Sequence, residues 1–191
     1  MATATRRRGA ELEGAIRDAV LDLVRDRGVS AVTMEAVAAR ARTSKPVLYR
    51  RWPDRAALLR DTLLTAATEA IPHADTGSYR SDMLAVLRGW AAAMTGDLAP
   101  VLVAVIAATA EDPELAAAFR DGVIGWRKQE MGELIARAVA RGEARPDVPV
   151  HLVRELGQSV LWHRLLVSGD PIDDALVVAI VDEVLLPVVR G

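Results

Sequence analysis

Residues 33–55 constrain the fold most, because they hold two short helical patterns separated by only a few residues. The hydroxyls of Thr33 and Ser44 can each accept a backbone hydrogen bond at the start of one pattern. The second pattern ends at Trp52, because a residue that precedes a proline, here Pro53, is disfavoured in a helix. This segment therefore predicts a tight corner of two short helices.

Helical spacing of apolar residues continues on both sides of this corner. Half of the residues are apolar, and glycine and proline fall mostly at the ends of segments, which favours an all-α protein over a β-rich one. With the two short helices of the corner, about nine helices are expected. The other seven are expected at residues 11–27, 54–71, 81–95, 98–110, 113–141, 150–167 and 173–186.

Charge divides the chain into a basic head and an acidic body. Residues 1–60 carry a net charge of +6 and residues 61–191 a net charge of −8, although the whole chain is close to neutral at −2. A basic head suggests that this part alone meets a polyanion. We expect a helix-turn-helix DNA-binding domain at residues 1–55, with a disordered arm over residues 1–10, and a separate helical domain at residues 56–191.

The second helix of the corner would offer a basic and polar face to DNA. Lys45 and Tyr49 share one side of it, and Pro46 and Arg50 flank them. Lysine and arginine can read guanine edges, small apolar groups can touch a thymine methyl, and hydroxyls and a helix N-terminus suit phosphates. The expected DNA contacts are Thr33, Arg42, Thr43, Ser44, Lys45, Pro46, Val47, Tyr49, Arg50 and Arg55, the last gripping a flanking phosphate.

Plainer interpretations exist for several of these residues. Tyr49 could be an ordinary half-buried aromatic residue, and Arg50 with Arg51 could form a solvated face. The arginines at residues 6–8 could be an inert tail. The cap, the turn, the basic face and the charge asymmetry coincide, however, and together they favour DNA binding.

Residues 11–60 resemble the N-terminal domain of the TetR family of bacterial transcriptional repressors. The matching residues are Thr33, Val37-Ala38, Ala41, Ser44, Leu48-Tyr49, Trp52, Pro53-Asp54-Arg55 and Leu58-Leu59. The chain departs from the family at Arg42, where the turn often has glycine, and at Pro46, where the family has a small residue. Arg42 either adds a phosphate contact or marks a different turn, so base preferences are not carried over.

The resemblance implies a homodimer whose subunits join through their last two helices. Residues 150–186 supply two apolar helices that suit this interface. The same helices could instead form a plain core within one chain. Two heads would then meet successive major grooves of a near-palindromic operator. The family's body holds a small-molecule pocket. Its expected lining residues, each of which could instead be simple core, are Met83, Leu87, Trp90, Met94, Ile106, Phe119, Val123, Trp126 and Trp162.

The expected function is a ligand-released, homodimeric repressor. Few charges fall on the expected pocket faces, so an apolar or aromatic effector is expected, with no cofactor. The three histidines have no carboxylate partners at ligand spacing, so no metal is expected. The rival interpretations are a small-molecule-binding helical protein without DNA function and an enzyme, for which no catalytic set stands out. The lack of cysteine, of a signal sequence and of a long apolar run fits the cytoplasm and no membrane.

Overall fold

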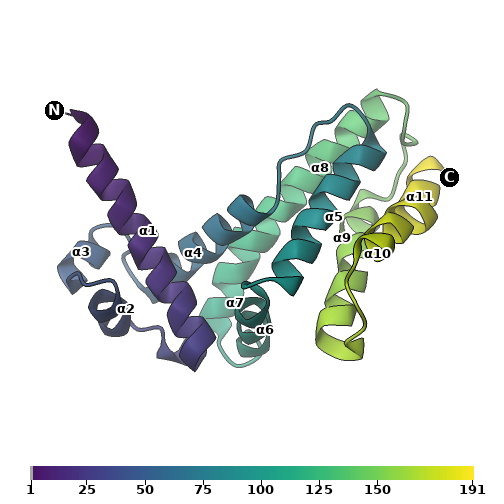
Figure 1. The fold of residues 1–191 in the computed structure, drawn as a ribbon. Coiled ribbons are helices and arrows are strands. Elements are labelled where there is room, and N and C mark those ends of the chain that lie inside the picture. The colour runs from purple at the N-terminus through teal and green to yellow at the C-terminus, as the bar shows by residue number, and fades with distance from the viewer. Residues whose placement is uncertain (1) are drawn as a thin grey trace. The chain divides into compact units, whose positions relative to one another are not determined.

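A computed structural model describes the backbone of residues 2–191 and the side chains from residue 9 onward. Over that range all regular secondary structure is helical (Figure 1). It amounts to nine helices when α-helical segments linked by a π-helical segment are counted as one helix and the short 3-10 turn is left out. The helices group into two compact units. The first unit is Met1–Thr65 with Pro100–Val123, and the second is Ala66–Ala99 with Ile124–Gly191.

The first unit is built around its N-terminal helix. This helix, α1, packs against the short 3-10 turn η1 and against α2, and α2 packs against α3. Its core includes the completely buried side chains of Ile16, Val37 and Leu48. The elements of this unit are α1 (Ala2–Arg27), η1 (Val29–Ala31), α2 (Met34–Arg40), α3 (Lys45–Tyr49), α4 (Arg55–Ala70, as far as Thr65), α6 (Ala99–Ala108, from Pro100), α7 (Pro113–Phe119) and the π-helical η2 (Arg120–Ile124, as far as Val123).

The first helix is longer than expected. It begins at Ala2, so the disordered arm predicted for residues 1–10 is wrong for residues 2–10. No proline interrupts this stretch, and its alanines and arginines are good helix formers, which is the physical reason for the extension. Residue 1 and the side chains at residues 6–8, where three arginines give the expected arm its charge, lie outside what the structure describes.

The second unit is centred on α5, which contacts α8, α9, α10 and η4. Paired hydrogen bonds fasten α5 to the last helix: Arg80 binds both carboxylate oxygens of Asp182 at 2.7 and 2.8 Å, and Arg88 binds both of Asp174 at 2.6 and 3.0 Å. The elements are α5 (Tyr79–Thr95), α8 (Gly125–Ala140), α9 (Val150–His163), η3 (Arg164–Ser168), α10 (Asp174–Ala179), η4 (Ile180–Leu185) and α11 (Leu186–Arg190).

Three of the expected helices contain or end in a π-helical segment, namely η2, η3 and η4. Each such segment rotates the side chains that follow it about the helix axis, because it holds more residues per turn than an α-helix. Within the described range no single helix has both the length and the apolar character needed to cross a membrane. The bent pair of α5 and α6 meets that test only when the two are taken together, on length and composition.

Candidate nucleic-acid interface and effector pocket

Local hydrogen bonds fix the start of α2 and the tight turn between α2 and α3. Thr33 has an extended backbone, and its hydroxyl accepts the N–H of Ala36 at 3.1 Å, as a helix cap does. At the other end of α2, Arg42 has a left-handed backbone with φ 51°, and the following N–H of Thr43 donates to the carbonyl of Ala38 at 2.9 Å. Glycine is the residue that adopts this backbone without strain, which accounts for its frequent use in such a turn.

One side of α3 is anchored in the first unit. Leu48 is completely buried and Trp52, just past the helix, is nearly so. The indole N–H of Trp52 donates to Oδ2 of Asp61 at 3.1 Å, and the same oxygen accepts Nε of Arg17 at 3.1 Å. Because α1 and α4 supply these partners, the short helix has a fixed orientation.

The other side of α3 is open to solvent. The side chains of Ser44, Lys45, Pro46, Tyr49 and Arg50 are exposed, Tyr49 to 50 %. Ser44 stands at the N-cap position, but its hydroxyl makes no capping hydrogen bond, contrary to expectation. Leu48 alone within residues 44–51 is buried, while Val47 is half-buried. The expected contact face is therefore presented outward on a rigid base.

Two cations form ion pairs in the free protein, one on this face and one beside it. Nζ of Lys45 lies 2.6 Å from Oε1 of Glu35, and Nε of Arg51 lies 2.6 Å from Oε1 of Glu13. The hydrogen bond to Lys45 lowers the pKa of Glu35 and raises the pKa of Lys45. No ion pair or hydrogen bond holds the guanidinium of Arg50 within the described part of the chain, so this group is free to meet a phosphate or a base edge.

Arg55, the expected contact to a flanking phosphate, has its guanidinium engaged within the protein. Its guanidinium points into the first unit, where it donates to the carbonyls of Val32 at 2.8 Å and Val29 at 3.2 Å and to Oδ2 of Asp112 at 2.9 Å. The side chain is 24 % exposed. Asp112 also accepts the N–H of Leu115 at the start of α7. The hydrogen bond from Leu115, and to a smaller extent the one from Arg55, lowers the pKa of Asp112. Arg55 thus joins η1 to α7, and a phosphate would compete with these three bonds.

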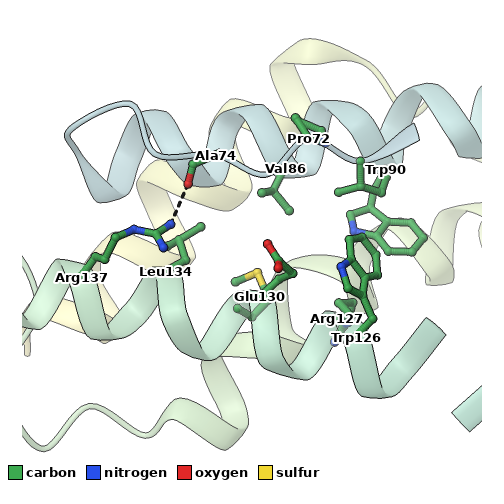
Figure 2. Close-up of a pocket in the computed structure, with 11 residues that line it drawn as sticks. Pro72, Ala74, Val86, Trp90, Trp126, Arg127, Glu130, Leu134 and Arg137 are labelled. Atoms are coloured by element: carbon green, nitrogen blue, oxygen red, sulfur yellow. Dashed lines mark hydrogen bonds between the residues drawn. The ribbon is translucent and has the colours of Figure 1, made fainter. Parts of the chain in front are cut away.

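A small cavity lies in the second unit between α5, α8 and the segment that follows α4. It offers about 20 Å³ of space, enough for roughly one water molecule. Figure 2 shows Trp90 of α5 and Trp126 of α8 near one end of it, and Arg137 near the other, with its guanidinium donating to the carbonyl of Ala74 at 2.7 Å. The remaining lining residues are Ile71, Pro72, Val86, Arg127, Glu130, Met131 and Leu134.

A second cavity of about 10 Å³ adjoins the first and shares part of its wall. The shared residues include Trp90 and Arg127. Burial lowers the pKa of Arg127 to about 10, since the charged form is the one that loses its hydration. The further lining residues are Met83, Val86, Leu87, Met131, Val153, Arg154, Gly157 and Gln158.

The two cavities bring together some of the expected pocket residues. Met83, Leu87, Trp90 and Trp126 line one or both of them, whereas the buried Met94 and the half-buried Trp162 line neither. Ile106, Phe119 and Val123 belong to the first unit. Arg127, Arg154 and Gln158 were not predicted, because the apolar stripes that indicated the other lining residues do not mark polar side chains. Among the described residues, no three histidine or acidic side chains gather as a metal site would need.

Comparison with known proteins agrees with this geometry. Residues 16–62 match the family model of bacterial regulatory proteins of the tetR family, and residues 73–184 match that of the tetracyclin repressor-like C-terminal domain. The DNA-binding transcriptional repressor TetR of Mycobacteroides abscessus is 36 % identical over 88 % of each chain. The HTH-type transcriptional regulator YdeS of Bacillus subtilis is 31 % identical over 85 % of this chain and 82 % of its own.

Solved structures give the same result. The TetR family transcription regulator SCO0332 is 34 % identical and superposes with a TM-score of 0.76, over 95 % of this chain and 100 % of that one. A second regulator, from a Rhodococcus species, has the same TM-score at 20 % identity, and this likeness concerns the fold alone.

Proposed function

Because the chain belongs to the TetR family of bacterial transcriptional regulators, we propose that it is a homodimeric repressor which a small effector releases from DNA. The family consists of DNA-binding regulators and not of enzymes. The observation that carries the proposal is the outward face of α3, which is held on its inner side by buried Leu48 and presents Lys45, Tyr49 and Arg50 to solvent. We place this activity in the cytoplasm, where a bacterial chromosome lies.

DNA contacts divide by chemistry. The start of α3 and the free hydroxyl of Ser44 suit phosphate oxygens, and Tyr49 suits a phosphate or a sugar edge. Lys45 and Arg50 are the side chains that can reach guanine in the major groove. Thr33 is exposed at the start of α2, but its hydroxyl is already engaged with Ala36, so any contact from it would be shared. Base readout would thus rest on few side chains.

The last two helices are the proposed dimer interface. They leave large apolar side chains exposed on the single chain, among them Leu152 at 49 % and Val167 at 74 %, together with Leu166 and Val184. Exposed apolar residues of this size on neighbouring helices are typical of a surface that another chain covers. A two-fold pair would place two α3 helices roughly 34–36 Å apart, one turn of the duplex, which requires a near-palindromic operator.

Effector release follows from a choice between two arrangements of the dimer. A ligand that fits the pocket of the second unit in only one arrangement shifts the population toward it. Moving an operator from mostly occupied to mostly free takes a differential affinity of a few kcal/mol. The walls formed by Trp90, Trp126 and Met131 favour an effector with an apolar or aromatic body. The repressor role is also supported by the relative from Mycobacteroides abscessus, whose name describes a repressor.

The test is a genome-wide selection of fragments by the purified protein, followed by fluorescence anisotropy with the recovered duplex. We expect one near-palindromic sequence, bound with an affinity that falls steeply with salt, by a log–log slope of about −0.9 for each phosphate contact. Recovery of no enriched sequence would favour the alternative, a helical protein that binds small molecules and not DNA.

Oligomeric state is tested separately by sedimentation velocity. The wild-type chain is expected as a dimer, and Val167→Glu together with Leu152→Glu is expected to shift it to monomer with unchanged helical content. A wild-type protein that sediments as a monomer at the concentrations that occupy the operator would contradict the dimer.

A further inference from the structure

Two cations without acidic partners line the second cavity of the second unit. The charged residues in its wall are Arg127 of α8 and Arg154 of α9, and no aspartate or glutamate lines it. The rest of the wall is apolar except for the buried amide of Gln158. This composition is unusual for a buried space, since charged groups are rarely buried without a partner.

Neither guanidinium is neutralised by the described protein. Nη2 of Arg127 donates to the carbonyl of Arg154 at 2.5 Å, but the Nε atoms of both arginines are buried and have no hydrogen-bond partner. Among the described residues no carboxylate comes within 4.0 Å of either one. Glu155 attracts Arg127 from a greater distance and is itself exposed. Arg127, whose pKa is lowered by burial, therefore carries a cost of burial that no acidic partner within 4.0 Å offsets, and Arg154 lies half-buried in the same wall.

The neighbouring arginine of the first cavity differs in having a carboxylate nearby and serves as an internal comparison. Arg137 donates to the carbonyl of Ala74 and has Oδ1 of Asp75 3.6 Å from its Nε, although that Nε is also buried without a hydrogen bond. The first cavity also contains the carboxylate of Glu130, which lies 2.5 Å from a ring nitrogen of His73. An added anion would meet repulsion from Glu130 there, whereas both charged side chains that line the second cavity are arginines.

We propose that the effector is an organic carboxylate, whose anionic group binds Arg127 and Arg154 in the second cavity and whose apolar or aromatic body lies against Trp90, Met83 and Met131. This rests on the proposed function, of which it specifies the ligand class. A carboxylate matches the planar fork of a guanidinium and forms charge-assisted hydrogen bonds with it. The pKa of Arg127, lowered to about 10 by burial, would return toward its ordinary value once the anion is bound.

The cavities as they stand are too small for such a ligand, so its binding must open them. Methionine suits this, because its unbranched side chain changes rotamer at little cost, and two methionines, Met83 and Met131, stand in the wall. A pocket that opens only with ligand has a closed and an open state, which is what effector release requires. A neutral amide or alcohol with the same apolar or aromatic body would leave both arginines without an anionic partner and would gain little affinity from them.

The experiment uses matched pairs of small probes with the full-length dimer: 2-naphthoate with 2-naphthamide, and decanoate with 1-decanol. Binding is measured by thermal shift and by the fluorescence of the pocket tryptophans. Each acid is expected to bind at least about tenfold more tightly than its neutral partner, and Arg127→Met is expected to abolish that preference. Lys128→Met removes an exposed cation from the same helix and is expected to leave the preference intact.

A second measurement keeps the test decisive if the probes bind weakly. Arg127→Met removes a half-buried cation without an acidic partner within 4.0 Å, so the Tm of the unliganded variant is expected to equal or exceed that of the wild type. A marked fall in Tm would mean that the hydrogen bond to the carbonyl of Arg154 outweighs the cost of burying the charge of Arg127, and it would overturn the proposal. Equal binding of acid and amide, or no binding of either acid up to millimolar concentration, would overturn it as well.

Operator affinity is measured separately, with and without the acid. An acid that binds through Arg127 but leaves operator affinity unchanged would contradict effector release while the carboxylate site stands. Loss of carboxylate selectivity in a protein that still binds its operator would contradict this inference and leave the DNA-binding function in place.

Discussion

The ammonium nitrogen of Lys45 on α3 lies 2.6 Å from Oε1 of Glu35 on α2, so the lysine of the exposed face of α3 has an acidic partner in the free protein. Both side chains are exposed, at 48 % and 64 %, and the pair raises the pKa of Lys45 and lowers that of Glu35. To reach a base or a phosphate, Lys45 would have to exchange this partner. We therefore expect Glu35 to oppose DNA binding, and more so for unselected sequences than for an operator that gives Lys45 a guanine.

Glu35→Gln is therefore expected to tighten binding to unselected duplex by about twofold to fivefold, because it removes a competitor for Lys45 and a negative charge beside the phosphates. The ratio of operator to unselected affinity should fall. Anisotropy at fixed low salt measures both constants. Asp97→Asn, at an exposed position after α5, is the control for loss of one negative charge, and an equal effect in both variants would contradict a specific role for Glu35.

Arg42→Gly separates backbone strain from DNA contact. Arg42 has φ 51°, a backbone that costs an arginine about 1 kcal/mol and a glycine nearly nothing. Glycine also gives the unfolded chain more freedom, at a cost of roughly 0.4–1 kcal/mol, so the free energy of unfolding should change little. Affinity for the operator should fall if the guanidinium meets a phosphate. Urea denaturation and anisotropy on the same sample measure the two, and unaltered affinity would show that Arg42 marks the turn only.

Much of the head follows from local sequence rules. The hydroxyl of Thr33, a predicted helix cap, accepts the backbone N–H three residues further on at 3.1 Å, and the carboxylate of Asp54 does the same at 2.7 Å at the start of α4. Such caps depend only on neighbouring residues, as does the end of α3 before Pro53, so they can be predicted from one sequence. The outward face of α3 followed in the same way from the buried position of Leu48 and the helical period.

The roles of Arg55 and Arg127 could not be predicted in this way. The partners of Arg55 lie 23, 26 and 57 residues away, and nothing local in the sequence brings η1 and α7 to it. Arg127 stands beside Trp126 on a helix that mixes apolar, acidic and basic residues. Only the packing of α8 against α5 and α9 decides that Arg127 is half-buried. The π-helical segments add a further shift of register that periodicity does not reveal.

Arg55→Ala is expected to destabilise the first unit by about 2 kcal/mol, since it removes one hydrogen-bond donor each from the carbonyls of Val32 and Val29 and from Oδ2 of Asp112. Chemical denaturation measures this loss. Arg120→Ala removes an exposed arginine of the same unit and is expected to have little effect. A stable Arg55→Ala variant with reduced operator affinity would instead support the phosphate contact that the sequence suggested.

Glu143 is expected to contribute to stability in a pH-dependent way. Its carboxylate accepts the backbone N–H of Tyr79 and binds Arg141, and these contacts, the first being the larger, lower its pKa below the ordinary 4.5. A carboxylate with a lowered pKa adds stability that is present above pH 4.5 and is lost as the pH falls through its folded pKa. Thermal unfolding from pH 7 to pH 3 should therefore show a shallower acid loss in Glu143→Gln. Glu69→Gln, at an exposed site on α4, is the control, and parallel curves for wild type and Glu143→Gln would contradict this account.

The most direct measurement is a salt titration of operator binding by the wild type and by Lys45→Ala, Tyr49→Ala and Arg50→Ala. We expect each substitution to weaken operator binding, by about 1–3 kcal/mol where the side chain reads a base, while the phosphate-contacting residues also flatten the log–log salt slope by about 1. Three variants with wild-type affinity and an unchanged slope would contradict the claim that the exposed face of α3 binds DNA.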